Sequence, residues 1–190
     1  MRHVAWARGL ANHLLERQLP RRWEHSRGVG TRGEEIAPIL GEDAELLAMS
    51  AWLHDIGYTP DLVDTGFHPI DGARYLRDVH GADELLCKLV AHHTCAAIEA
   101  GDRGLLDILE REFPMERPDL VEALTFCDMT TSPDGVQVKV EDRLAEIRSR
   151  YGPEHLVTGT IQKATPCIMS AVRTVRERLD SADVRLAFAG

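Results

Sequence analysis

Apolar residues recur along this chain every three or four positions, and strict alternation of apolar and polar residues is rare. The first spacing is typical of an α-helix with one buried face, and the second of a half-buried strand. Only residues 136–140 have a brief strand-like pattern. The sequence therefore predicts an all-α protein.

Glycine and proline residues divide this pattern into segments of helical length. We expect helices over residues 4–15, 23–40, 42–53, 70–79, 83–93, 105–112, 118–129, 140–151 and 154–179. No repeat, low-complexity segment or long linker separates them. We therefore predict a single-domain helical bundle of eight or nine helices over residues 1–180, and a weakly ordered C-terminal tail over residues 181–190.

The composition narrows the classes of partner. Hydrophobic residues make up 44% of the 190 residues and charged residues 28%, as in soluble globular proteins. A net charge of -9 gives no general attraction to a nucleic acid polymer or an anionic membrane. No apolar run approaches the roughly 18 residues that cross a bilayer, and the first residues do not resemble a signal peptide. We expect a cytoplasmic protein with neither kind of partner.

The four cysteines do not suggest a metal site or a disulfide. No Cys-x-x-Cys pair occurs, and Cys87, Cys127 and Cys167 lie among apolar residues. Such cysteines usually behave as small core residues in a reducing compartment. We expect neither a zinc-thiolate site nor a disulfide framework.

The candidate chemistry begins at His54-Asp55, which directly follows the apolar segment 46–53. An imidazole and a carboxylate at that depth are costly unless they are paired or bind a metal. Taken alone, the pair is better explained as the ordinary end of a helix, and only the wider pattern favours a metal. Four other helical segments also carry a His or an Asp near one end: His25, His68, His92-His93 and Asp128. Helix ends can converge in a bundle, and these side chains suit a divalent transition metal.

This ordered set resembles the HD superfamily of metal-dependent phosphohydrolases over residues 20–145, and Leu53-His54-Asp55-Ile56-Gly57 resembles its HDIG variant. The resemblance implies one metal held by His25, His54, Asp55 and Asp128. In two-metal members, the positions of His68, His92 and His93 hold a second ion, and the doublet Asp bridges the two. In one-metal members these positions contact substrate phosphate.

His92 and His93 cannot both face one site from a regular helix, because adjacent helical residues point about 100° apart. Either the helix ends there or only one of the two is a ligand. Tyr58 stands where many HDIG proteins carry Lys or Glu shortly after the doublet, and no Gly-Tyr-Pro motif lies near His92-His93. These departures leave the substrate open and argue against cyclic-dinucleotide hydrolysis.

The resemblance implies a phosphohydrolase that cleaves a phosphoester or phosphoanhydride of a nucleotide or related small molecule. One or two ions of Fe, Mn, Co, Ni or Zn would activate water. Asp55, His68 and His93 are the candidate catalytic residues. Lys139 and Arg143 are candidates for binding phosphate, although solvated helix charges are the more common explanation for such residues.

Two other functions remain open. One is a di-iron oxygenase on the same scaffold, and the other is a non-catalytic nucleotide-binding module. The amphipathic final helix could pack either on its own domain or on a second copy of the chain in a homodimer.

Overall fold

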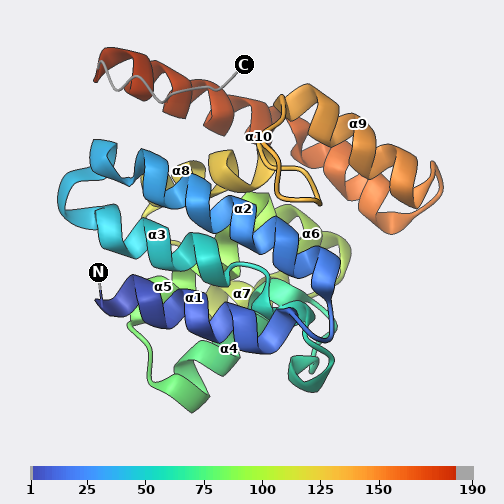
Figure 1. Ribbon diagram of the computed structural model, residues 1–190. Helices are drawn as coiled ribbons and strands as arrows, with labels where there is room; N and C mark the ends of the chain where they lie inside the picture. Colours follow the sequence, from blue (N-terminus) through green and yellow to red (C-terminus); the bar gives the residue numbers. More distant parts are fainter. Residues whose placement is uncertain (1, 183–190) are drawn as a thin grey trace.

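The computed structural model describes residues 2–182 and consists of helices and loops (Figure 1). Its α-helices are α1 (Arg2–Leu15), α2 (Pro20–Ile36), α3 (Ala44–Leu53), α4 (His68–His80), α5 (Glu84–His92), α6 (Ala96–Asp102), α7 (Leu106–Glu112), α8 (Pro118–Met129), α9 (Val140–Tyr151) and α10 (Leu156–Ser181). Short 3₁₀ helices are η1 (Ala37–Asp43), η2 (Ile56–Tyr58), η3 (Pro60–Leu62) and η4 (His93–Cys95). A single isolated bridge, between Thr131 and Gln137, is the only strand-like pairing within residues 2–182. The all-α prediction is confirmed.

Most predicted helices are present, and two differences concern places where a helix breaks. The predicted helix 23–40 is α2 followed by η1, which contains Pro38. Helix α6 was not predicted. It is separated from α5 by Thr94 and Cys95, whose φ angles of 51° and 58° are left-handed. Neither residue is Gly or Pro, so nothing in the local sequence marks this break.

Residues next to the helix ends explain where α4 stops and where α5 starts. Gly81 adopts the left-handed conformation, with φ 55°, that commonly ends a helix. The Asp83 carboxylate then accepts hydrogen bonds from the backbone N–H groups of Leu85 and Leu86, which caps α5.

The interior contains two groups of packed apolar side chains that share helices α3 and α5. One group joins α2, α3, α5, α8, α9 and α10, and the other joins α1 and α3 to α7. Trp52 belongs to the second group and lies directly against Gly30, where an added Cβ would come within 2.3 Å of its ring. The absent side chain at this point lets α2 and α3 pack closely.

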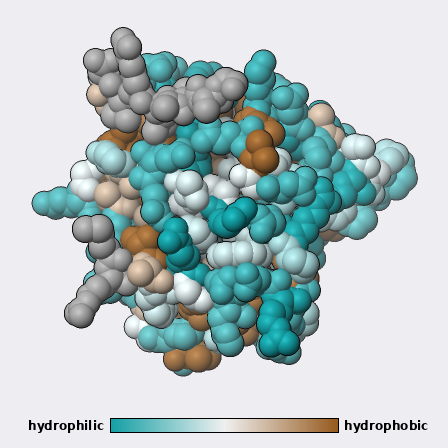
Figure 2. Space-filling model, viewed as in Figure 1, coloured by the Kyte–Doolittle hydropathy of each residue, from teal (hydrophilic) through white to brown (hydrophobic). Residues whose placement is uncertain are grey.

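Helix α10 packs on its own domain. Its apolar side chains, including Ile168, Val172 and Val175, belong to the core group that α8 forms. In Figure 1, α9 and the first half of α10 form a hairpin at the edge of the bundle. The amphipathic face of the last helix is therefore used within the chain. Figure 2 shows a largely hydrophilic face on which hydrophobic side chains form only small, separate groups.

The prediction of buried, unpaired cysteines is confirmed for two of the four cysteines and wrong for the other two. Cys87 and Cys127 are buried and free, as predicted. Cys95 and Cys167, however, form a disulfide, and Cys167 is exposed rather than part of the core. The left-handed turn at Thr94-Cys95 brings Cys95 beside α10, and a pairing across 72 residues leaves no signal in local spacing.

Among the described residues, none of the helices has the length and apolar character needed to span a bilayer. The predicted tail lies almost entirely outside the described residues, since the description ends at Ala182.

Candidate metal centre

Helix α3 brings His54 and Asp55 into the interior. Almost every residue of its second half is buried, so the helix is enclosed on all sides and its C-terminal end lies deep. His54 is fully buried and Asp55 is 3% exposed. The Nδ1 of His54 donates to the carbonyl of Ala51 at 2.9 Å, which fixes the ring and leaves Nε2 toward the site. That Nε2 is buried and makes no hydrogen bond within the described residues.

His25 from α2 and Asp128 from α8 complete a first cluster around this nitrogen. His25 donates through Nδ1 to the carbonyl of Ser132 at 3.0 Å, and its Nε2 lies 3.0 Å from Oδ1 of Asp128. The ligand atoms of His25, His54 and Asp128 all lie within 4.8 Å of one another. Three residues far apart in sequence thus form one compact donor set, which we call cluster 1.

Asp55, His68 and His93 form a second donor set, cluster 2, by the same distance measure. The Oδ1 of Asp55 lies 3.4 Å from Nε2 of His68 and 3.9 Å from Nε2 of His93. The two imidazole nitrogens are 3.1 Å apart. His93 is oriented by donating through Nδ1 to the carbonyl of Val90 at 2.6 Å.

Asp55 lies between the two clusters. While its Oδ1 faces cluster 2, its Oδ2 lies 3.4 Å from Nε2 of His54 and 3.9 Å from Nε2 of His25. One carboxylate therefore presents one oxygen to each donor set. This is the arrangement that a carboxylate bridging two cations requires.

His92 belongs to neither cluster, which corrects its place among the candidate ligands. Helix α5 ends at His92, and His93 begins η4, so the two adjacent rings diverge. The Nε2 of His92 donates to the carbonyl of Phe113 at 2.5 Å and not to a group of either cluster. His92 therefore anchors α5 to the end of α7, and His93 alone faces the site.

The two candidate phosphate-binding residues, Arg143 and Lys139, line different cavities. Arg143 is 6% exposed and lines the same pocket as Asp55, His68 and His93. Lys139 is exposed, directly precedes α9, and lines a different cavity beside Gln137. The structure thus places Arg143 at the pocket of the clusters and Lys139 at a different cavity.

Gly57 explains how His68 approaches the His-Asp doublet. A Cβ at Gly57 would lie 2.0 Å from the backbone oxygen of His68 and 2.6 Å from the nitrogen of Gly72. Any side chain here would push the first turn of α4 away from the loop after α3. The glycine of the Leu-His-Asp-Ile-Gly segment is therefore needed for cluster 2 to form.

Arg22 and Tyr58 complete the surroundings of Asp55 and His68, and sequence reasoning assigned neither to the site. Arg22 donates through Nη1 to Oδ2 of Asp55 at 2.7 Å, and its guanidinium lies 3.8 Å from the centre of the Tyr58 ring. Tyr58 in turn stacks on His68, with ring centres 3.8 Å apart. The spacing of Arg22 and His25, three apart on one helix, was the available signal that Arg22 faces the same way.

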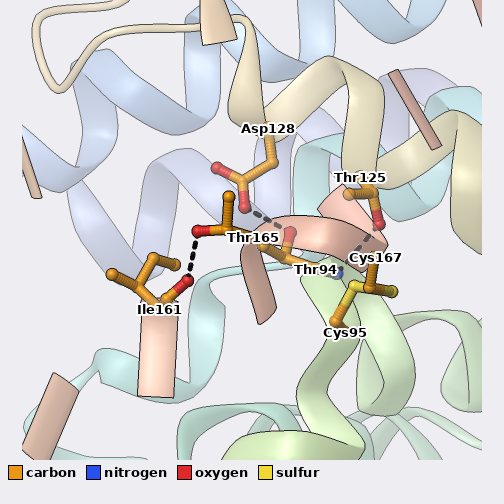
Figure 3. Close-up of a disulfide and its surroundings, with 7 residues drawn as sticks. All are labelled: Thr94, Cys95, Thr125, Asp128, Ile161, Thr165 and Cys167. Carbon is orange, nitrogen blue, oxygen red and sulfur yellow. Dashed lines mark hydrogen bonds between the residues drawn. A yellow bond between two sulfur atoms is a disulfide. The ribbon is translucent and has the colours of Figure 1, made fainter. Parts of the chain in front are cut away.

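Thr94 connects cluster 1 to the disulfide (Figure 3). Its hydroxyl donates to Oδ2 of Asp128 at 2.5 Å, and its backbone N–H donates to the hydroxyl of Thr125 at 3.2 Å. Thr94 and Cys95 are both left-handed, which costs about 1–3 kcal/mol for each residue. The Cys95–Cys167 disulfide joins this strained turn to α10.

The electrostatics suit a cation. Burial alone would raise the pKa of Asp55 and of Asp128. The charge of Arg22 and the imidazole of His54 nevertheless hold the pKa of Asp55 well below its usual range. The imidazoles of His25 and His54, together with the charge of Arg143, likewise lower the pKa of Asp128. Burial lowers the pKa of His68, and burial with the neighbouring imidazoles lowers the pKa of His93 to about 3. Ionised carboxylates and neutral imidazoles are the forms that bind metal.

His54 is the exception among the imidazoles. Burial would lower its pKa, but the charge and hydrogen bonding of Asp55, together with the charge of Asp128, outweigh burial and raise it. A raised pKa indicates an excess of negative charge around Nε2. A bound cation would neutralise that charge and give the orphaned nitrogen a partner.

A comparison with protein families bears directly on this site. The family model of the HD domain matches residues 22–145. The chain belongs to the HD-domain family. The matched segment of this HD domain contains every residue of both clusters, from His25 to Asp128. Neither the curated proteins nor the solved structures contain a significant match to the chain.

Membership of the family implies a metal-dependent, hydrolase-type fold, and the donor set of this HD domain fits a divalent cation. The fit rests on the buried, unpartnered Nε2 of His54 and on the shared carboxylate of Asp55. Imidazole nitrogen with carboxylate oxygen suits Fe, Mn, Co, Ni and Zn alike.

Proposed function

We propose that this protein is a metal-dependent phosphohydrolase that cleaves a phosphoester or phosphoanhydride of a nucleotide or related small molecule. The observation that carries the proposal is the position of Asp55, with one oxygen toward each of two donor sets. A pair of cations bridged by one carboxylate is a common solution for hydrolysing phosphate compounds.

Each residue has a distinct part in this proposal. His25, His54 and Asp128 would hold one ion, and Asp55, His68 and His93 the other, with Asp55 shared. Ions bound there would lower the pKa of a water molecule to near neutrality and polarise a phosphoryl oxygen. We also propose that the segment around His54 is of the HDIG type.

Several of the chain's own groups would orient the reacting parts. Arg22 fixes the Asp55 carboxylate from the side opposite His68. Thr94 fixes the Asp128 carboxylate through its second oxygen. Arg143 would neutralise negative charge on the phosphoryl group.

The pocket supports a substrate with an organic part. It has a volume of about 110 Å³ and extends from the clusters to apolar side chains of the α9–α10 hairpin, including Ile147, Tyr151, Val157 and Ile161. Tyr58 and Phe67 also line this pocket. Such side chains could pack against a base or another apolar group. The acidic composition favours a small substrate over a nucleic acid polymer.

Phosphate release from a panel of nucleotides and simple phosphate esters tests this proposal. The protein is purified without chelator or nickel resin, and each assay is repeated after removal of the metal. We expect release that stops with the chelator and returns when metal is added. Asp128→Ala should lower the rate by about a thousandfold, because the metal contributes several kcal/mol of transition-state stabilisation. Full activity in Asp128→Ala would rule out this site.

The two-cluster geometry also favours a second candidate, a di-iron oxygenase, because a shared carboxylate serves an iron pair equally well. Oxygen uptake by iron-loaded protein, with the optical band of a mixed-valent pair, would support that function. Tight metal binding with no turnover of either kind would indicate a non-catalytic module instead.

A further inference from the structure

A second cavity opens beside the metal centre and is lined by arginines. It has a volume of about 320 Å³, and its walls include Arg21, Arg22, Arg143 and Arg150. Among residues 2–182, no aspartate or glutamate lines it. Four guanidinium groups around one cavity are notable in a chain whose net charge is -9.

This cavity continues from the pocket of the metal centre. Arg22, His25, Arg143 and Arg150 line both cavities. Arg22 bonds to the shared carboxylate of Asp55, and the charge of Arg143 contributes to the low pKa of Asp128. A ligand group at the clusters would therefore have the arginine-lined cavity next to it.

The guanidinium groups retain capacity to bind an anion. Arg143 and Arg150 share one carboxylate, that of Glu146, at 2.5 and 2.8 Å. The Arg143 side chain is only 7% exposed, and its buried Nε makes no hydrogen bond within the described residues. A buried donor without an acceptor is uncommon and costs about 1–3 kcal/mol.

Phosphate fits this cavity well. A guanidinium presents several N–H donors in a planar fork that matches phosphate oxygens, and such charged hydrogen bonds are among the strongest in proteins. Within residues 2–182, no carboxylate belongs to the lining itself. The carboxylates that contact these arginines from outside the lining are those of Asp55, Asp134 and Glu146. A single phosphoryl group at the clusters could reach Arg143 but would leave the donors of Arg150 unused, whereas a chain of two or more phosphates would reach both.

We infer that the arginine-lined cavity is a subsite for a second phosphoryl group, so that the substrate carries a di- or polyphosphate chain. This inference rests on the proposed phosphohydrolase function and specifies its substrate class. One phosphoryl group lies at the clusters, and the adjoining group lies among Arg22, Arg143 and Arg150. Arg21, whose side chain is 62% exposed, stands at the rim.

Binding of inorganic tripolyphosphate and orthophosphate to metal-free protein, measured by calorimetry, tests the inference without turnover. We expect tripolyphosphate to bind at least about tenfold more tightly than orthophosphate. Arg150→Gln should weaken tripolyphosphate binding by about 10- to 100-fold, the range for one charged hydrogen bond. It should change orthophosphate binding much less.

Two further variants serve as controls for the loss of charge and for the loss of fold. Arg148→Gln removes the same charge from an exposed position on α9 that lines neither cavity, and it should bind tripolyphosphate as the wild type does. Arg143→Lys keeps the buried charge but loses the planar fork, so it should weaken binding while the thermal unfolding curve shows that the fold is retained. Equal binding of the two anions, or equal losses in Arg148→Gln and Arg150→Gln, would overturn the inference.

Turnover by the metal-loaded enzyme separates this inference from the proposed function. Arg150→Gln should raise KM for adenosine triphosphate more than for adenosine monophosphate. A chain that binds tripolyphosphate through Arg150 but hydrolyses nothing would contradict the phosphohydrolase proposal alone. An enzyme that hydrolyses monophosphates equally well in wild type and Arg150→Gln, with no preference for longer chains, would contradict the subsite alone.

Discussion

Clusters 1 and 2 differ in how their histidines are held. In cluster 1, His25 and His54 both donate through Nδ1 to backbone carbonyls, and both are almost completely buried. In cluster 2, His93 is anchored in the same way, but His68 has no backbone partner in the described part of the chain. The His68 side chain is 13% exposed and rests against Tyr58.

This difference indicates which imidazole ring can change its orientation. A ring fixed by a backbone hydrogen bond presents its other nitrogen in one direction, which favours tight metal binding. A ring that is held only by neighbouring side chains, as His68 is by Tyr58, His93 and Asp55, can move with them. We therefore expect cluster 1 to hold its ion more tightly, and cluster 2 to hold its ion more weakly and nearer the substrate.

Removing His93, the ligand of cluster 2 that a backbone hydrogen bond anchors, should change metal content and activity more than the other substitutions that compare the two clusters. His93→Ala should bind one ion fewer than the wild type and lose activity by about a hundredfold or more, because one catalytic cation is lost. Cluster 1 should keep its ion. Elemental analysis and phosphate release measure the two effects.

His92→Ala is the matched control, since it removes the neighbouring buried imidazole that bonds to Phe113 instead of facing the site. It should retain both ions and lose about 1–3 kcal/mol of stability from the unpaired carbonyl. Equal metal loss in the two variants would contradict the assignment of His93 alone to cluster 2.

A methyl group at Gly57 should disturb cluster 2 selectively. Gly57→Ala places a Cβ against the backbone of His68, and the resulting shift should destabilise the fold by about 1–3 kcal/mol. The ion of cluster 2 should bind about tenfold more weakly, while that of cluster 1 is unchanged. Metal titration followed by calorimetry resolves the two sites.

Gly9→Ala provides the comparison, because no atom lies within 4 Å of the added Cβ on α1. This variant should match or slightly exceed the wild-type stability, since Ala favours a helix more than Gly does. If Gly57→Ala also kept wild-type affinity at both sites, the close approach of α4 would not determine the position of His68.

The disulfide should have the smallest effect on the metals and should act chiefly on stability. Cys167→Ser removes a cross-link that closes a loop of 72 residues, which should cost about 2–4 kcal/mol in the free energy of unfolding. Both ions should remain bound. Denaturant unfolding with and without a thiol reductant measures the loss, and the reductant should have no further effect on Cys167→Ser. An unchanged unfolding curve on reducing the wild type would contradict this role.

Sequence pattern was sufficient for much of the fold and for most of the donor set. Helix ends at Gly81 and Asp83 follow from local chemistry that acts within a few residues. The apolar run before His54 indicated that the doublet lies deep, which the burial of His54 and Asp55 confirms.

The remaining features depend on contacts between distant residues. The break after His93 results from left-handed Thr94 and Cys95, which are held by Thr125, Asp128 and the disulfide rather than by their own sequence. For this reason the local sequence indicates that only one of His92 and His93 can face the site from a regular helix, but it does not indicate which one. Arg150 likewise lines the pocket only because the α9–α10 hairpin contributes to its wall.

The most direct test of the central claim, that Asp55 is shared by two ions, is the metal content of wild-type protein and of His68→Ala by elemental analysis. Both proteins are purified without chelator or nickel resin and then saturated with one divalent metal. The geometry of the two clusters predicts two ions per chain in the wild type and one in His68→Ala. One ion in both proteins, or none in the wild type, would contradict it.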